Sequence, residues 1–400
     1  MRGYGPEAPW RLREDVIFLN HGVFGACPVP VLERQRALLD ELEAGPVAFL
    51  DGTIGARVDA ARAAVAAFLG ADPDGLVFVP NATTGVSTVL RSLTFKPGDE
   101  LLATNHEYNA TLNALSEVAR ASGARVVTVR LALEVESAGQ VTKAILAAVT
   151  PRTRLALVSH VTSPTATIFP IAEIVRELDA RGVDTLVDAA HAPGMVPLDV
   201  GALGAAYWTG NGHKWLCGPK SSGMLAVRAD RRDRIRPLII SHGWNDPDPG
   251  RPRLWKEFDW VGTVDPTPFL TLPTAIDVVG RLDPGGWPGL LAANHVLVLD
   301  ARERIAQALG VRLRTPAALI GSMAIVPLPM DADDRAAEAL RSVLVNEDRI
   351  DVSIMAWPFR AARLSPTDPP DAIVVRVSAQ RYNEPADYDR LSAALARRLG

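Results

Sequence analysis

The stretch "TGNGHKWLCGPKSSG", residues 209–223, places a histidine and a lysine side by side among glycines. The apolar run "AAYWTG" at 205–210 leads into it, and "GMLAV" at 223–227 follows it. This order predicts two strands joined by a polar loop that carries Lys214. An isolated loop lysine is usually a solvated surface charge. Whether Lys214 has a chemical role therefore depends on which residues follow the neighbouring strands and lie close to it.

Similar apolar runs recur upstream, at residues 76–79, 100–104, 125–129, 154–159 and 184–189. Helical stretches separate most of them, for example residues 109–122 and 171–181. With the two runs around Lys214, this alternation predicts an α/β fold with a mostly parallel, seven-stranded sheet covered by helices on both faces.

The pattern changes after about residue 285. A long helical run at 290–309, the run "MAIVPL", a helix at 332–345, the run "IVVRVS" and a last helix from Pro385 predict a smaller α+β domain over residues 286–400. We expect residues 46–285 to form the large, ligand-binding domain. Residues 1–45, with a helix around 31–43, are expected to pack with the small domain.

Charge and cysteine content narrow the function classes. A net charge of −4 with intermixed signs argues against a nucleic-acid partner or an anionic membrane surface. The two cysteines, Cys27 and Cys217, have no metal-ligand spacing and fit a reducing compartment. The N-terminus lacks an apolar leader and no run is long enough for a membrane span, so we expect a cytoplasmic protein that acts on a small molecule.

Polar side chains follow most of the predicted strands. In open α/β sheets, ligands bind beyond the carboxyl ends of the strands, where these residues would converge. The stretches concerned are "PNATTG" at 80–85, "NHEYNA" at 105–110, "SHVTSPTATIFPI" at 159–171, "DAAHAPG" at 188–194 and the stretch around Lys214.

Each of these groups has an ordinary interpretation and a chemical one. "NATTG" opens a helix, where free N–H groups can hold a phosphate or merely be capped. Asp188 can keep a heteroaromatic nitrogen protonated, or cap the next turn. Tyr108 can cover one face of a planar ligand, or be a half-buried aromatic residue. His191 can form a hydrogen bond with a phenolic oxygen of a bound aromatic ligand, or be an ordinary loop histidine.

These neighbouring residues favour a chemical role for Lys214. A desolvated lysine, or one close to other cations, becomes a nucleophile able to form a Schiff base. We expect Gly210, Gly212 and Gly218 to leave room for a planar group. A Schiff-base lysine, an acid for a ring nitrogen, a phosphate loop and a stacking ring, in this order, suit pyridoxal phosphate.

The chain resembles the class V aminotransferase family of fold type I pyridoxal-phosphate enzymes. Within it, the chain is most similar to the isopenicillin N epimerase-like branch, which also holds cysteine desulfhydrases and C–S lyases. The stretches that carry the resemblance are "FLNHGVFGACP", "HEYNA", "SHVTSPTATIFPI", "DAAHAPG", "TGNGHKWLCGPK", "FDWVGTVDPTPFL" and "VVRVSAQRYN". It implies pyridoxal 5′-phosphate as cofactor, an amino-acid substrate and a homodimer.

The resemblance also implies a role for each matching residue. Lys214 holds the cofactor as a Schiff base, Asp188 pairs with the pyridine nitrogen, and Tyr108 stacks on the ring. Ser163 and His191 lie near the phenolic oxygen. The phosphate contacts are the backbone N–H of Ala82 together with Thr83, Asn211 and His213. Gly262 and Thr263 reach the phosphate of the partner subunit. Arg376 clamps the substrate carboxylate, and Asn20 and His21 contact the substrate.

The resemblance leaves the reaction open. In each candidate reaction the substrate would form an external aldimine, and Lys214 would remove the α-proton. We expect β-elimination from a cysteine-type substrate, by a C–S lyase, because it needs the fewest further residues. Epimerisation is the alternative and needs a second acid or base, for which His21 or Tyr108 could serve; transamination is a third. A non-enzymatic regulator with this fold is disfavoured. Because no cysteine follows Cys217, a persulfide-forming desulfurase is not expected.

Overall fold

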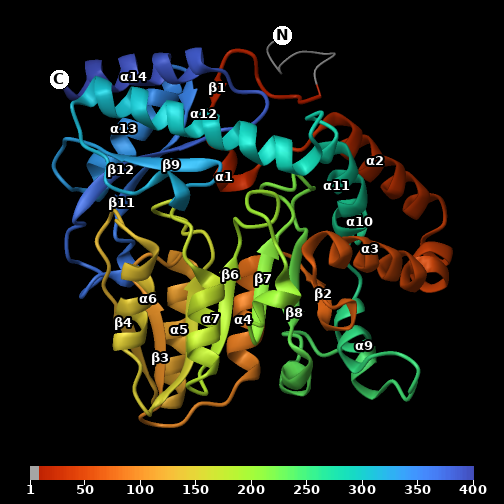
Figure 1. The fold of residues 1–400 in the computed structure, drawn as a ribbon. Helices are drawn as coiled ribbons and strands as arrows, with labels where there is room; N and C mark the ends of the chain where they lie inside the picture. Colours follow the sequence, from red (N-terminus) through yellow and green to blue (C-terminus); the bar gives the residue numbers. More distant parts are fainter. Residues whose placement is uncertain (1–8) are drawn as a thin grey trace.

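A seven-stranded sheet forms the centre of the larger part of the molecule (Figure 1). The computed structural model describes residues 9–400. In spatial order the strands are β2 (Leu76–Val79), β8 (Gly223–Val227), β7 (Tyr207–Asn211), β6 (Asp184–Ala189), β5 (Thr153–Ser159), β3 (Glu100–Thr104) and β4 (Arg125–Val129). Only β8 runs against its neighbours, β2 and β7. The predicted mostly parallel sheet is confirmed.

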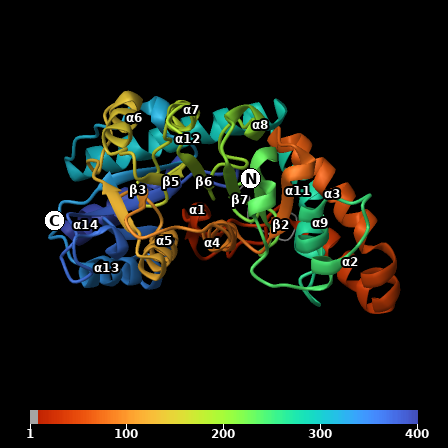
Figure 2. The same ribbon diagram turned by 90° about the horizontal axis from the view of Figure 1, so that it is seen from below.

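Helices cover both faces of this sheet, as Figure 2 shows. On one face lie α6 (Ala138–Ala147), α7 (Ile171–Asp179) and α8 (Val200–Leu203), and on the other lie α4 (Ala82–Ser92) and α5 (Asn109–Ser122). Most strand residues are buried, in agreement with their continuous apolar sequences. Further helices lie on the β2 side of the sheet. α3 (Ile54–Leu69) and α9 (Arg253–Asp259) contact β2, and α10 (Thr267–Leu270) and α11 (Leu272–Gly280) pack against α3.

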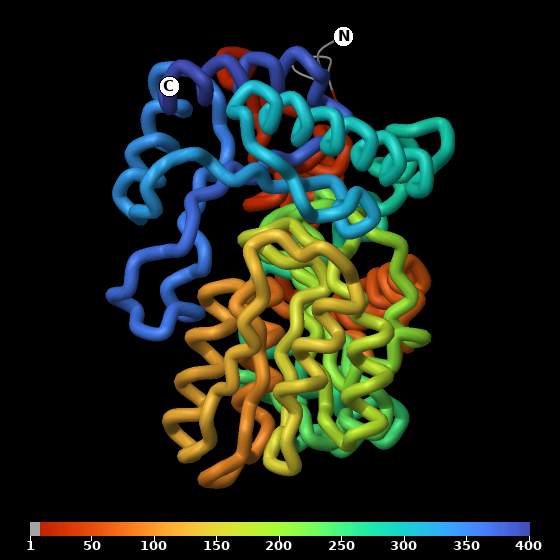
Figure 3. The backbone as a smooth tube through the Cα atoms, turned by 60° about the vertical axis from the view of Figure 1, so that its left-hand side comes forward, coloured from red at the N-terminus to blue at the C-terminus, as the bar shows by residue number. Residues whose placement is uncertain are grey.

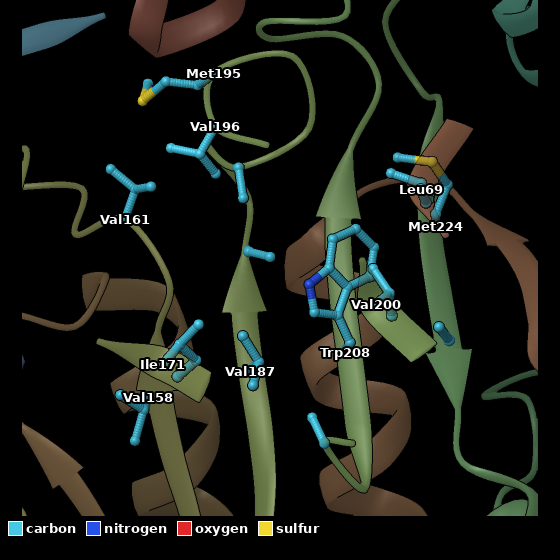
Figure 4. Packing of buried hydrophobic residues seen from close by; sticks show 14 of the residues in the cluster. Leu69, Val158, Val161, Ile171, Val187, Met195, Val196, Val200, Trp208 and Met224 are labelled. Atoms are coloured by element: carbon cyan, nitrogen blue, oxygen red, sulfur yellow. The ribbon is translucent and has the colours of Figure 1, made fainter. Parts of the chain in front are cut away.

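The packing around β7 fixes the strands that lead to the Lys214 loop. Figure 4 shows the Trp208 indole on β7 within a cluster of buried apolar side chains that includes Val187 of β6 and Met224 of β8. On the opposite face, α4 lies very close to β7: a Cβ at Gly85 would be 2.1 Å from the Thr209 hydroxyl oxygen. Only glycine permits this approach, which brings the start of α4 to the end of β7.

The C-terminal part is a smaller α+β unit, as predicted. Its sheet has the order β11 (Ser353–Trp357), β12 (Ala372–Ser378), β9 (Met323–Pro327), and both pairings are antiparallel. Its helices are α12 (Gly286–Leu309), α13 (Asp334–Asn346) and α14 (Pro385–Leu399). β11 is an addition to the predicted elements. The β11–β12 connection, which includes the short helix η6 (Arg360–Ala362), descends beside α5 of the large domain (Figure 3).

The N-terminal segment divides between the two parts of the molecule. β1 (Ile17–Phe18) pairs with β10 (Ile350–Asp351), and α1 (His21–Phe24) follows it. In contrast, α2 (Val29–Ala44) packs against α10 and α11 beside the large sheet. The expectation that the helix of this segment packs with the small domain is therefore wrong, because its apolar stripe meets α10 and α11 instead. Of the helices in residues 9–400, none combines the length and apolarity needed to cross a bilayer.

Candidate active site

A cavity of about 180 Å³ lies at the carboxyl ends of β5, β6 and β7, beside the first residues of α4 and α5. It is lined by Val23, Phe24, Asn81, Ala82, Thr83, Tyr108, Ser159, Val161, Ser163, Asp188, Ala190, His191, Asn211, His213 and Lys214. The polar residues predicted from the strand ends thus converge on one cavity. Asn20, His21, Gly262, Thr263 and Arg376 are not among its lining residues.

Lys214 presents its amine to this cavity. Its Nζ lies 3.1 Å from Nε2 of His191. Burial, and to a smaller extent the positive charge of Arg376, lower the pKa of Lys214 to about 7, although the carboxylate of Asp188 opposes both effects. A substantial fraction of the amine is therefore uncharged near neutrality, which is the form that attacks a carbonyl group or accepts a proton.

Asp188 is the penultimate residue of β6, and its carboxylate is buried. Its Oδ1 accepts a hydrogen bond from the backbone N–H of Ala190 at 3.0 Å. Burial raises the pKa of Asp188, while that hydrogen bond and the charge of Lys214 act in the opposite sense. A buried carboxylate of this kind is stabilised by a nearby cation, and a protonated ring nitrogen would supply one.

A second buried carboxyl group, which the sequence analysis missed, lies behind Asp188. Glu107 accepts hydrogen bonds from Ser159 and, at 2.8 Å, from Thr104. Burial, with a smaller contribution from the charge of Asp188, raises the pKa of Glu107 to about 8, although the hydrogen bonds from Ser159 and Thr104 act in the opposite sense. Glu107 stands in the quoted motif "NHEYNA", but neither its position nor its type distinguishes a buried acid from a surface one. Only the fold shows that Ser159 pairs in register with Asp188.

The start of α4 also lines the cavity, through Asn81, Ala82 and Thr83. Asn81 caps this helix, its Oδ1 accepting from the Thr84 N–H at 2.9 Å. The N–H of Ala82, predicted to hold a phosphate, instead donates to Oδ1 of Asn211 at 2.8 Å. Nδ1 of His213 is buried and has no hydrogen-bond partner among the described residues. With Thr83, these groups form a polar end suited to an anion at a helix N-terminus.

The glycines around Lys214 do not have the predicted role. A Cβ at Gly210 would be 2.6 Å from the Trp208 ring, and one at Gly212 or Gly218 would be 2.5 or 2.6 Å from Leu272. These positions are glycine because protein atoms approach them, not because they leave room for a ligand. Their contribution is to fold the loop tightly enough to fix Lys214.

Arg376 and Tyr108 bring the two domains together near the cavity. Arg376, on β12, is buried; its Nη1 donates to the carbonyl oxygen of Ser163 and, at 3.3 Å, to the Ser163 hydroxyl. Its Nε is buried without a partner among the described residues. Tyr108 is 42% exposed and contacts Phe359 edge-on at 6.2 Å between ring centroids. An unsatisfied guanidinium N–H beside the cavity is a donor available to a carboxylate.

Asn20 and His21, predicted to contact the substrate, form hydrogen bonds with other protein groups instead. The Asn20 amide donates to Asp351 at 3.0 Å and accepts from Ser353 at 2.6 Å. His21 is fully buried, with Nδ1 2.7 Å from the Tyr382 hydroxyl and Nε2 3.1 Å from the Lys214 carbonyl oxygen. These contacts join α1 to the C-terminal domain and to the Lys214 loop. The stretch "FLNHGVFGACP", which contains Asn20 and His21, also places Val23 and Phe24 at the cavity, a role that was not predicted from the sequence.

Gly262 and Thr263 lie outside this cavity. Gly262 has a φ of 103°, and Thr263 is exposed at the surface. A separate apolar cavity of about 330 Å³ is lined by residues on either side of them, including Val261 and Val264. Contact with the phosphate end of the cavity in the same chain is therefore not seen.

The cavity suits pyridoxal phosphate in its donor set. It has a partly uncharged amine in Lys214, a buried carboxyl group in Asp188 and a polar helix N-terminus with an unpaired imidazole nitrogen in His213. An aromatic ring, Tyr108, lines the same space. These are the groups needed to bind an aldehyde, a ring nitrogen, a phosphate and a ring face.

Comparison with known proteins agrees with this geometry. The aminotransferase class-V profile matches residues 27–283. The chain is 33% identical over 392 residues to isopenicillin N epimerase of Streptomyces clavuligerus, covering 95% of this chain and 94% of that one. It is 32% identical over 402 residues to putative L-cysteine desulfhydrase 1 of Oryza sativa subsp. japonica, covering 94% and 82%.

Solved structures show the same fold. The cystine C-S lyase C-DES, in complex with cysteine persulfide, aligns with a TM-score of 0.77 and 22% identity, covering 96% of this chain and 98% of that one. The fold is thus that of the fold type I pyridoxal-phosphate enzymes. The cofactor of the protein is pyridoxal 5′-phosphate, and the chain belongs to the class-V aminotransferase family.

Proposed function

We propose that the protein is a C–S lyase that carries out β-elimination on a cysteine-type amino acid. The observation that carries the proposal is Lys214, a half-buried lysine with a pKa of about 7 that lines the cavity and lies 3.1 Å from His191. One such base is sufficient for removal of the α-proton and loss of a thiolate from Cβ. Relatives named L-cysteine desulfhydrase support this reaction class.

The residues of the chain divide the chemical work. The bound cofactor supplies an electron-accepting ring, which Asp188 keeps protonated at its nitrogen. Lys214 removes the proton from Cα, and the electron pair left at Cα forms a double bond to Cβ as the thiolate departs. Water then hydrolyses the released enamine, through its imine, to a keto acid and ammonia. Arg376 holds the substrate carboxylate through its planar guanidinium group.

Cys217 supports elimination without an enzyme-bound persulfide. It is fully buried, and burial raises the pKa of its thiol well above the ordinary value. Its Sγ lies 3.6 Å from Nε2 of His21 and donates to the Trp215 carbonyl oxygen at 3.5 Å. A buried, protonated thiol is a poor nucleophile.

Epimerisation is the second candidate, and the relatives named isopenicillin N epimerase favour it. It requires a second acid or base. Burial lowers the pKa of His21 to about 3, and both ring nitrogens face protein groups, so His21 is unsuited to that role. Tyr108, which lines the cavity, is the group that would have to serve. Transamination needs no added group and forms a third outcome.

We further propose that the protein acts as a homodimer in which Thr263 reaches the phosphate site of the partner subunit. Two features support this assembly. Thr263 is exposed beside the half-exposed Val264, and Leu238, Ile239, Ile240 and Trp244 form further exposed apolar surface in the preceding segment. Sedimentation of wild type and Val264→Glu tests the assembly: a dimer should shift toward monomer, and a wild-type monomer would refute it.

Incubation in D₂O with S-substituted cysteines, and with peptides ending in an L- or D-amino acid, distinguishes the reactions. Thiol release with formation of pyruvate identifies a lyase. Recovery of inverted substrate that carries deuterium at Cα identifies an epimerase. Keto-acid formation without thiol release, with an amino group retained on the cofactor, identifies an aminotransferase.

A further inference from the structure

Trp215, the residue after Lys214, contacts the histidine that faces the Lys214 amine. Its side chain is completely buried, and its indole Nε1 lies 3.4 Å from Nδ1 of His191. The ring of His21 packs against it at 4.8 Å between centroids. An indole N–H can donate a hydrogen bond but cannot accept one. Nδ1 of His191 is therefore the acceptor in this pair.

The charge state of His191 then determines where its proton lies. Burial lowers the pKa of His191 well below its ordinary value, and the nearby charges of Lys214, Arg376 and His213 lower it further. The ring is consequently neutral and carries one proton. Because Nδ1 accepts from Trp215, that proton is on Nε2.

Nε2 of His191 is the atom that faces Lys214, at 3.1 Å from Nζ. A free amine has a lone pair and accepts a hydrogen bond from Nε2–H. An ammonium group has only donors, so an Nε2–H directed at it is unfavourable. The other charged groups that act on Lys214 are Arg376, from β12, and Asp188, at the end of β6.

We propose that Trp215 is a positioning residue, which fixes His191 as the Nε2–H tautomer and so presents a hydrogen-bond donor to the free amine of Lys214. The role in catalysis rests on the proposed function of Lys214. The tautomer itself does not depend on it and can be observed without any reaction.

Nitrogen NMR of the full-length protein with ¹⁵N-labelled histidine tests the tautomer, with and without bound pyridoxal phosphate. The chain has seven histidines, and the spectrum of His191→Gln identifies the His191 signals by their loss. The expected wild-type pattern is a protonated Nε2 and an unprotonated Nδ1 between pH 6.5 and 8. A wild-type ring protonated at Nδ1 would overturn the proposal, whatever the variants do.

Trp215→Phe removes the indole N–H and keeps an aromatic ring. We expect the Nδ1–H tautomer of His191 to rise several-fold in population. The matched control is Trp208→Phe. Trp208, which is labelled in Figure 4, is also almost completely buried, but its Nε1 has no hydrogen-bond partner among the described residues. An unchanged tautomer in Trp215→Phe, or an equal change in both variants, would contradict the proposal.

The second readout is the pH dependence of acylation of Lys214 in the cofactor-free protein. Peptide mapping isolates this lysine from the others. In Trp215→Phe, the midpoint should move to higher pH, because His191 no longer opposes the ammonium form, whereas Trp208→Phe should keep the wild-type midpoint. A midpoint that stays in place in Trp215→Phe would show that the tautomer has no effect on the amine.

Discussion

Arg376 of the C-terminal domain donates a hydrogen bond to the backbone carbonyl of Ser163 on the loop after β5. This contact holds the guanidinium group at the edge of the cavity, and its buried Nε has no partner among the described residues. The small domain therefore places a cation beside a cavity that is lined mainly by the large domain, together with Val23 and Phe24 of α1.

Arg376→Ala should weaken binding of amino acids by about 10- to 150-fold, the loss expected for a charge-assisted hydrogen bond of roughly 1.5–3 kcal/mol. Amines without a carboxylate should bind almost as well as they do to wild type. Spectral titration of the cofactor-loaded protein with both ligand classes measures the difference. Equal weakening of both classes would remove the assigned role.

Lys214→Ala should lose the visible absorption of bound pyridoxal phosphate on dialysis, because the amine that holds it is gone. Lys220→Ala is the matched control: Lys220 donates to the Gly25 carbonyl oxygen at 2.8 Å and does not line the cavity. It should keep the band. Retention of the band by Lys214→Ala, or loss in both variants, would show that the wrong lysine has been assigned.

The sequence was sufficient to predict the sheet because its strands are continuous apolar runs separated by amphipathic helices. It also predicted that Asp188, His191 and Lys214 lie at strand ends. Parallel connections bring such ends to one edge, so sequence order translates directly into proximity. Neither β11 nor the pairing of β1 with β10 was predicted from the sequence, because these elements depend on contacts between distant segments.

Side-chain environment was less predictable than position. Gly212 and Gly218 could serve a ligand or a packing contact, and only the position of Leu272 decides between them. His21 has the sequence context of a site residue, yet its ring nitrogens bond Tyr382 and the Lys214 carbonyl. Glu107 is the opposite case, because nothing in its sequence context marks it as a site residue. Its position beside Asp188 depends on the pairing of β5 with β6.

The pH dependence of Lys214 follows from its neighbours. In the cofactor-free protein, the rate of Lys214 acylation should rise through a midpoint near pH 7, because only the free amine reacts. Arg376 lowers the pKa of Lys214 and Asp188 raises it, so Arg376→Ala should move the midpoint up and Asp188→Asn should move it down. Shifts in the same direction for both variants would contradict this electrostatic account.

His21 should act in stability rather than in proton transfer. Its folded-state pKa, about 3, lies below the value of roughly 6.5 for an unfolded histidine, so the unfolded state binds more protons as the pH falls. The contribution of neutral His21 to stability is therefore complete above pH 6.5 and is lost progressively toward pH 3. At pH 7, His21→Gln should lower the free energy of unfolding by about 1–3 kcal/mol, because the buried hydrogen bonds are altered. A lower urea concentration at the midpoint of unfolding measures this loss.

The same substitution separates the structural role from the catalytic one. His21→Gln should still exchange the α-proton of a bound amino acid in D₂O, and its stability should depend less on pH between 6.5 and 3 than that of wild type. His242→Gln, at an exposed position, is the control and should change neither property. If His21→Gln abolishes α-proton exchange while its unfolding curve matches wild type, His21 takes part in the chemistry and the epimerase alternative regains its second acid.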